Sequence, residues 1–435
     1  MTRAPLLGRA VWQAGLLALG TASALGLARF AYGLLLPAMR EDLRWTLAEA
    51  GTMSTANGLG YLLGALVTAA VVRRWGTAAA FRIGMVLTAV SLAATAASDA
   101  YLPLLTARAA AGAAGAVVFI VGGVIASRVA AHAASSVPIT VYFAGTGLGI
   151  IVSGVSIPAL GNHWRLAWIG LATAAALAAA ASWGAARGGA GSEGAGSEGA
   201  GSGGAGSGGA ARGGAGTGGA AREGVGSTGG GARADVAGRA RVRPLLGAAL
   251  AYLLFAAGYI TYITFLSAYL ADQRAPLGQV VLTWTVLGLA VVAAPALWSR
   301  PTAEWPATRA LATLLALLAG GAALALVAPA PPVILASAII YGATFMGVPA
   351  AITALIKSNV PPADWTATLA AFTTVFAAGQ TAGPWIAGVV ADHTSTEATL
   401  AWTAILCATA SVIAFAGGRA RSRLRPDEAV HDQRQ

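Results

Sequence analysis

Two arginines lie inside stretches of sequence that are otherwise apolar. Arg29 interrupts the run 11–39, and Arg108 interrupts the run 102–127. A guanidinium can bind a carboxylate or a phosphate through two parallel hydrogen bonds, so either side chain suits an anionic ligand. The alternative is a structural arginine that donates to backbone carbonyls and polar side chains. The residue types leave both interpretations open.

Further polar and aromatic side chains accompany the arginines along apolar segments. From the helical rise, Arg29, Asn57 and Arg108 lie roughly 15, 12 and 9 Å from the same end of their segments, so we expect one shared layer. Tyr259 and Tyr262 are three residues apart and should share a helix face, although such a pair serves packing more often than binding. The candidate substrate-binding residues are Arg29, Asn57, Arg108, Tyr259, Tyr262, Tyr341, Thr344 and Gln380.

The composition indicates an integral membrane protein. Of 435 residues, 57% are hydrophobic and only 10% are charged, whereas soluble proteins carry about 25% charged residues. One cysteine, Cys407, excludes an internal disulfide and a cysteine-based metal site. The four histidines are scattered, and no phosphate-binding loop, dinucleotide fingerprint or nucleophile elbow occurs. We therefore expect neither an enzyme nor a cofactor.

Apolar runs of about 20 residues predict membrane spans, and two groups of six occur. The first group comprises 12–39, 49–72, 79–98, 102–127, 136–160 and 164–184. The second comprises 245–271, 278–299, 308–328, 332–356, 364–391 and 397–417. The prediction is an all-α membrane protein of twelve transmembrane helices in two six-helix halves, 1–184 and 244–418, followed by a tail, 419–435.

The segment between the halves, 185–243, consists almost wholly of Gly, Ala, Ser and Arg. Such a composition cannot bury enough apolar surface to fold, so we expect a flexible tether. A basic segment that touches anionic lipid headgroups is the alternative. Of the 27 Lys and Arg residues, 21 fall on segments that share a side with the N-terminus and 4 on the opposite side. This asymmetry predicts that both termini and the tether are cytoplasmic, and leaves no support for nucleic-acid binding.

Glycines in the two halves follow the same spacing. Gly145, Gly149 and Gly154 in the fifth predicted span correspond to glycines 234 residues later in the eleventh. Gly26 and Gly258 correspond in the same way at an offset of 232. Together with the six-plus-six layout, these matches suggest duplicated halves of the same topology, as in known transporters. Small residues at these positions also let helix backbones approach closely.

Several stretches carry a family resemblance, among them ARFAYGLLLPAM, TANGLGYLLGAL, GYITYITFLSAYL and GQTAGPWIAGVVAD. With the twelve-span layout they resemble the major facilitator superfamily (MFS) of secondary transporters, and within it a poorly characterised bacterial branch of sugar-efflux-like permeases. The segment from Arg108 to Gly112 fits the superfamily's R-x-x-x-G motif. The loop 73–76 lacks the acidic residue of the family gate, and Ile157-Pro158 replaces the Gly-Pro of the antiporter signature.

The resemblance implies a monomeric secondary transporter in the bacterial cytoplasmic membrane. It would move a small organic solute, with a lean towards an anion, by alternating access to a central site lined by spans one, four, seven and ten. A proton gradient is the family's usual energy source, and the sequence holds no ATP-binding motif. The alternative from another functional class is a membrane sensor that kept the transporter fold without net transport. An enzyme would need an acid, base or metal constellation within the spans, and a passive channel would show no counterflow.

Overall fold

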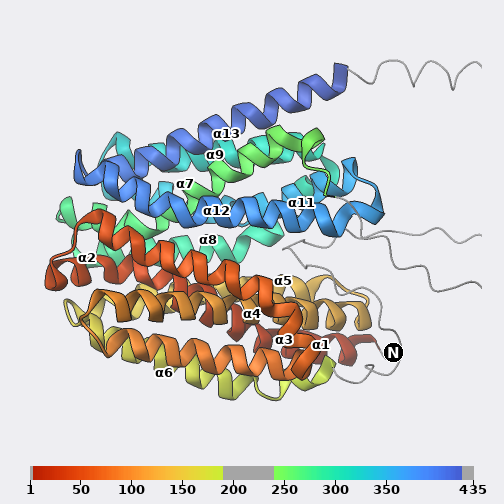
Figure 1. Cartoon of the computed structure of the whole chain (residues 1–435), viewed down its shortest axis with the longest axis horizontal. Coiled ribbons are helices and arrows are strands. Elements are labelled where there is room, and N and C mark those ends of the chain that lie inside the picture. The colour runs from red at the N-terminus through yellow and green to blue at the C-terminus, as the bar shows by residue number, and fades with distance from the viewer. Residues whose placement is uncertain (1–2, 190–239, 424–435) are drawn as a thin grey trace, which may run out of the picture.

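The computed structural model describes residues 3–189 and 240–423, and every regular element within these ranges is a helix. The first half consists of α1 (Arg3–Thr21), the π-helix η1 (Ala22–Phe30), α2 (Ala31–Leu43), α3 (Leu47–Ala96), α4 (Tyr101–His132), α5 (Val137–Ser156), η2 (Pro158–Leu160), α6 (Trp164–Ser182) and η3 (Ala185–Gly189). Figure 1 shows the long helices lying side by side along the longest axis of the molecule.

The second half follows residues 190–239, which belong to the predicted tether and lie outside the described residues, as does the tail beyond residue 423. Its helices are η4 (Arg243–Leu245), α7 (Leu246–Asp272), α8 (Leu277–Glu304), α9 (Ala307–Val327), α10 (Pro331–Phe345), α11 (Gly347–Asn359), η5 (Pro362–Asp364), α12 (Trp365–Asp392) and α13 (Glu397–Arg423). The all-α membrane fold predicted from the sequence is confirmed.

Within the described residues, ten helical segments are long and apolar enough to span a membrane. One of them, α3, has 50 residues, so its length of about 75 Å suffices for two crossings of a hydrocarbon layer about 30 Å thick. Another helix, α12, has 28 residues but is less apolar, because it contains Gln380, Pro384 and several threonines. With α3 divided and α12 included, the helices correspond one to one with the twelve predicted spans.

A single glycine divides α3 into its two crossings. Gly76 has φ 79° and ψ 164°, a backbone conformation that few residues other than glycine adopt. The predicted loop 73–76 between the second and third spans is therefore a sharp kink at Gly76.

We expect Gly76→Ala to destabilise the protein by about 1–3 kcal/mol, because a Cβ strains this conformation. Gly170→Ala on α6 is the matched control, since a Cβ at Gly170 meets no atom within 4 Å. Thermal unfolding in detergent measures both. A melting temperature of Gly76→Ala equal to that of the control would show that the kink tolerates a side chain.

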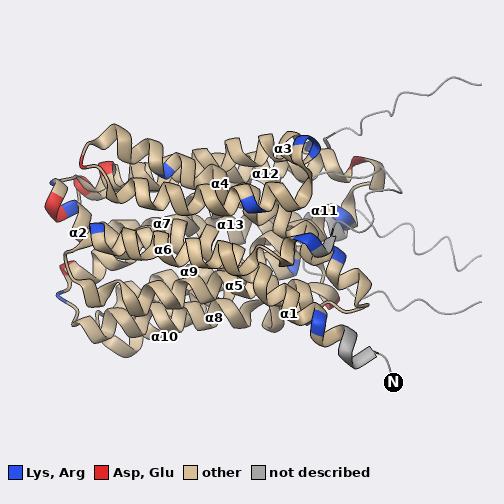
Figure 2. Cartoon of the chain, turned by 90° about the horizontal axis from the view of Figure 1, so that it is seen from below, with Lys and Arg blue, Asp and Glu red and all other residues tan. Residues whose placement is uncertain are grey.

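The charged side chains gather at the two ends of the helix bundle, and Lys and Arg dominate the end that holds the N-terminus (Figure 2). We call this the tether end, because the start of the tether lies there, with the Ala185 carbonyl oxygen accepting a hydrogen bond from Gln13 of α1. The opposite end, which holds the α2–α3, α5–α6, α7–α8 and α12–α13 connections, is called the distal end. This separation of charge is the one that the predicted topology requires.

The glycine repeat predicted from the sequence makes corresponding contacts in the two halves. On α5, a Cβ at Gly145 would lie 2.0 Å from the Ala18 carbonyl oxygen, and one at Gly149 would lie 2.4 Å from that of Ala22. Only hydrogen fits in such a space, so these glycines let α5 pack directly on the backbone of the first span.

The second half repeats this packing with the next set of glycines. On α12, a Cβ at Gly379 would lie 2.4 Å from the Leu253 carbonyl oxygen, and one at Gly383 would lie 2.2 Å from that of Ala257. The eleventh span thus packs on the seventh as the fifth packs on the first. For these two glycine pairs the correspondence extends to the contacted backbone atoms, as expected for duplicated halves. The predicted match of Gly26 and Gly258 is not repeated in the contacts, because Gly26 packs against Gly149 on α5 whereas Gly258 packs against Thr403 on α13.

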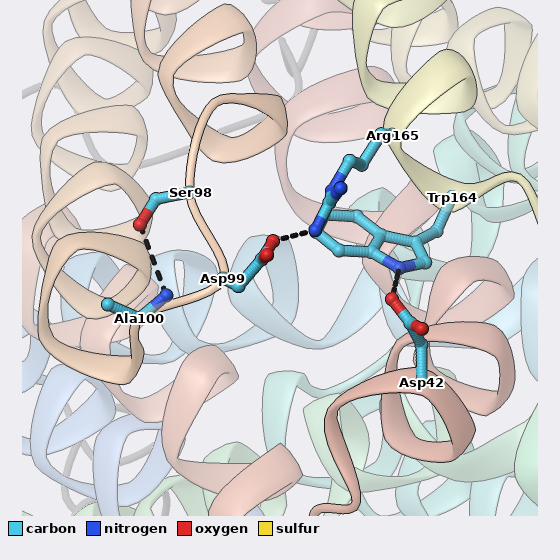
Figure 3. A network of polar contacts seen from close by, with 6 residues as sticks. All are labelled: Asp42, Ser98, Asp99, Ala100, Trp164 and Arg165. Carbon is cyan, nitrogen blue, oxygen red and sulfur yellow. Dashed lines mark hydrogen bonds and ion pairs between the residues drawn. The ribbon is translucent and has the colours of Figure 1, made fainter.

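A polar network ties together the distal ends of the first half (Figure 3). Trp164 Nε1 donates to Asp42 Oδ2 at 2.8 Å, which joins α6 to α2. Arg165 forms an ion pair with Asp99 in the α3–α4 turn, and its guanidinium lies 4.9 Å from the Trp164 ring centroid. These contacts connect three helix ends, so this rim should move as one unit.

Candidate functional site

Close backbone contacts join the two halves on the distal side of the bundle. A Cβ at Gly51 on α3 would lie 2.3 Å from the Pro384 carbonyl oxygen on α12, and one at Gly33 on α2 would lie 2.1 Å from that of Ile263 on α7. In the second half, a Cβ at Gly388 on α12 would lie 2.5 Å from the Leu47 carbonyl oxygen of α3. The distal halves of these helices therefore touch without intervening side chains.

Hydrogen bonds reinforce the same junction. The Asp392 carboxylate, at the end of α12, accepts hydrogen bonds from the backbone N–H groups of Leu47 at 2.7 Å and Ala48 at 2.9 Å. It thereby caps the first turn of α3 in the other half, where a negative charge is favourable. Deeper along the same helix pair, Thr55 Oγ1 donates to the Thr381 carbonyl oxygen at 2.6 Å.

Arg29 lies at the deep end of this junction, about 21 Å from the distal end of α2, and its side chain is 7% exposed. Its Nη2 donates to Gln380 Oε1 at 2.6 Å, which links the first span to α12 in the second half. Tyr259 OH donates to the same oxygen at 3.3 Å, and the Arg29 guanidinium lies 5.4 Å from the Tyr61 ring centroid. Arg29 belongs to η1, and π-helical turns occur frequently at functional sites.

Two buried side-chain donors at this contact, Arg29 Nε and Gln380 Nε2, have no hydrogen-bond partner. An unpaired buried donor costs about 1–3 kcal/mol, so such groups call for an explanation. Both orphaned groups are N–H donors beside a positive charge. The cluster of Arg29, Tyr61, Tyr259 and Gln380, here called the Arg29 cluster, is therefore suited to a ligand that supplies acceptor oxygens and negative charge.

Arg108 is held inside the first half. It is 1% exposed, its Nη1 donates to the Ala28 carbonyl oxygen at 2.7 Å, and its guanidinium lies 4.9 and 5.1 Å from the ring centroids of Tyr32 and Trp168. Asn57 Nδ2 donates to the Arg108 carbonyl oxygen at 3.1 Å. Arg108, Asn57 and the residue before Arg29 thus meet at one level, as the estimated depths predicted, but through backbone carbonyls and aromatic rings.

The remaining candidates, Tyr262, Tyr341 and Thr344, lie inside the second half. Tyr262 and Tyr341 are stacked with ring centroids 3.9 Å apart, and the hydroxyl groups of Tyr262 and Ser337 are hydrogen-bonded at 2.8 Å. Thr344 Oγ1 donates to the Ile340 carbonyl oxygen of its own helix at 2.7 Å. Both tyrosine rings therefore pack against α10, where Tyr259 is stacked on Phe345 at 6.0 Å, but the Tyr259 hydroxyl reaches Gln380 whereas that of Tyr262 reaches Ser337.

Other residues of the site were missed by the sequence analysis. Tyr61 follows Asn57 by four residues, and Phe376 precedes Gln380 by four. Residues four apart lie on the same helix face, so this spacing could have identified both rings. Of the eight candidates, Arg29, Tyr259 and Gln380 meet directly across the junction, while the hydrogen bonds of the other five stay within one half.

Comparisons with known proteins identify the family of the chain. The family described as "Uncharacterised MFS-type transporter YbfB" matches residues 21–197 and 226–418. No curated protein matches the chain.

The fold resembles those of solved transporters at low sequence identity. A crystal structure of a mutant of the nucleoside transporter NupG has 12% identity and a TM-score of 0.67, with 94% of this chain and 99% of that chain covered. A bacterial homologue of the human lysosomal transporter Spinster, in an inward-facing and unoccupied conformation, has 12% identity and a TM-score of 0.64, with 94% and 97% covered. Because the family match covers most of the chain, the chain belongs to the YbfB family of MFS-type membrane transporters.

Proposed function

We propose that this transporter moves a small organic anion across the bacterial cytoplasmic membrane by alternating access. The two halves, 1–184 and 244–418, rock about the Arg29 cluster, and the monomer is the functional unit. The observation that carries this proposal is the bond between Arg29 and Gln380, which links the two halves through a buried guanidinium. A positive group at the interface of two moving halves can bind an anion from either side.

In this proposal the tether end faces the cytoplasm, as the excess of Lys and Arg favours. The glycine contacts and the Asp392 cap then close the external side of the junction. The structure would accordingly be a state that receives or releases substrate on the cytoplasmic side. Rocking opens the external side by separating α2 from α7 and α3 from α12.

A proton gradient is the proposed energy source. Acidic residues in the described ranges lie at helix ends and in connections, so a proton has no carboxylate to occupy near Arg29. Asp392 is the acidic side chain that bridges the halves. Loss of the negative charge on this side chain would weaken its two hydrogen bonds to α3 and thereby favour external opening.

We expect Asp392→Asn to shift the protein towards the externally open state. The amide retains one acceptor but loses the charge at the α3 N-terminus, which costs about 0.5–2 kcal/mol. Spin labels at Ala100 and Ser395, on the distal ends of the two halves, would report a longer distance. Asp99→Asn is the matched control, since Asp99 pairs within the first half alone. Equal distances in both variants would remove Asp392 from the closing mechanism.

Counterflow tests the proposal itself. Comparing the metabolites of a deletion strain and its parent, inside and outside the cell, would identify organic anions that the protein moves. Proteoliposomes preloaded with the unlabelled anion should then accumulate the labelled form transiently. Saturable binding of that anion without counterflow would instead identify a sensor that kept the transporter fold, and uncoupled flux without counterflow would identify a channel.

A further inference from the structure

Aromatic rings from both halves surround the Arg29 cluster. In the first half, the ring centroids of Tyr61 and Phe119 lie 6.4 Å apart, and those of Phe119 and Phe143 lie 5.6 Å apart. In the second half, the Phe376 ring is stacked on Tyr252 at 5.0 Å and on Tyr259 at 5.6 Å. The Arg29 cluster includes one ring from each group, Tyr61 and Tyr259, so the two groups meet at the charged site.

The exposure of these rings distinguishes them from core aromatics. Tyr61, Phe119, Phe143 and Phe376 are only partly buried, whereas Tyr262 is fully buried in the core of the second half. Phe376 lies about 24 Å from the distal end of α12 and Phe119 about 27 Å from that of α4. Both therefore lie farther from the distal end than the Arg29–Gln380 bond, on the side away from the glycine contacts between α3 and α12.

The buried side-chain atoms of the Arg29 cluster that lack a hydrogen-bond partner are all N–H donors. Arg29 Nε and Gln380 Nε2 are buried donors without partners, and Arg29 carries a charge that no carboxylate in the described spans offsets. Tyr259 OH adds a third polar group next to them. Donors at one end and flat π surfaces at the other are complementary to a flat molecule with acceptor oxygens at its edge.

We infer that the substrate is an aromatic or heteroaromatic acid. Its ring lies between Tyr61 of the first half and Phe376 of the second. Its anionic group accepts the hydrogen bond of Arg29 in place of the Gln380 side-chain oxygen. Because the ring touches both halves, the bound substrate replaces the bond that joins them at this depth. This inference rests on the proposed function, since it assigns the substrate class of the same site.

Matched ligands test the ring and the charge separately in binding experiments that require no transport. Isothermal titration calorimetry of the full chain in detergent would use 2-naphthoate, its saturated analogue decahydro-2-naphthoate, and the neutral 2-naphthalenemethanol. Aromatic pairs contribute about 0.5–1.5 kcal/mol beyond burial, so 2-naphthoate should bind about two- to tenfold more tightly than the saturated acid. The neutral alcohol should bind at least about tenfold more weakly than 2-naphthoate, because it lacks the charge that Arg29 recognises.

Variants assign each preference to its residue. Tyr61→Leu and Phe376→Leu should each reduce the preference for the aromatic acid over the saturated one, whereas Phe415→Leu, on an exposed part of α13, should leave it unchanged. Arg29→Gln should remove the preference for the acid over the alcohol and keep the preference for the ring. Equal binding of the aromatic and saturated acids, no binding of 2-naphthoate, or an unaltered ring preference in both leucine variants would overturn the inference. Any of these results would leave counterflow of another anion, and hence the proposed function, intact.

Discussion

Arg29→Ala is expected to reduce transport of the organic anion by about 10- to 100-fold, because a hydrogen bond to a charged group contributes about 1.5–3 kcal/mol. The same variant should fold as well as the wild type. Arg29 is buried without a carboxylate partner, so its removal also removes a desolvation penalty. Initial uptake rates in proteoliposomes, normalised to inserted protein, measure the first effect, and thermal unfolding in detergent measures the second.

Arg29→Lys separates charge from geometry. Lysine keeps the positive charge but lacks the planar fork that can serve an anion while it stacks on Tyr61. Transport by this variant should therefore also fall, with stability retained. Arg309→Ala, at an exposed position on α9, controls for the loss of an arginine elsewhere. Transport at the wild-type rate in Arg29→Ala would remove Arg29 from the site.

Placing a methyl group at Gly51 and Gly388 together should prevent closure of the distal junction. Each Cβ would lie within 2.5 Å of a backbone carbonyl oxygen of the other half, at 2.3 Å for Gly51 and 2.5 Å for Gly388. Backbone atoms cannot rotate away as side chains do, so the halves must separate. Overpacking costs about 1–3 kcal/mol at each site, which is enough to change the population of the closed state tenfold or more.

The double variant Gly51→Ala/Gly388→Ala should lengthen the distance between spin labels at Ala100 and Ser395 and slow transport at least about tenfold. Gly278→Ala is the control, since a Cβ at Gly278 on α8 meets no atom within 4 Å. The control should match the wild type in both measurements. If the double variant kept the short distal distance, the glycine contacts would not be what closes this end.

The number and order of the helices could be predicted from the sequence because each span is a long apolar run. The places where the regular α-helix is interrupted within a span could not be predicted from the sequence. The π-helix η1 (Ala22–Phe30) contains Gly26, which packs on the α5 backbone, and a π-helix has no composition that distinguishes it from an α-helix. In the tenth span, one helix ends at Phe345 and another begins at Gly347, although the sequence predicted one continuous segment.

The site was predictable to the extent that polar residues inside apolar runs are rare. Arg29 and Gln380 stood out for that reason, and they are hydrogen-bonded across 351 residues of sequence. Tyr262 was expected to share the face of Tyr259, but residues three apart differ by about 60° around a helix. Both rings pack against α10, yet the Tyr259 hydroxyl reaches Gln380 on α12 and the Tyr262 hydroxyl reaches Ser337 on α10. Which face meets which neighbour depends on tertiary packing, and periodicity within one helix does not contain that information.

The central claim is that the two ends of one junction open alternately, and distances measured at both ends test it most directly. In a Cys407→Ser background, one spin-label pair at Ala100 and Ser395 reports the distal end, and a second pair at Arg74 and Ser358 reports the tether end. Double electron–electron resonance in lipid nanodiscs should find a short distal distance together with a long tether-end distance, and a second population in which both are reversed. Addition of the transported anion should change the proportion of the two populations. A single population at both ends, unaltered by the anion and by Gly51→Ala/Gly388→Ala, would contradict alternating access.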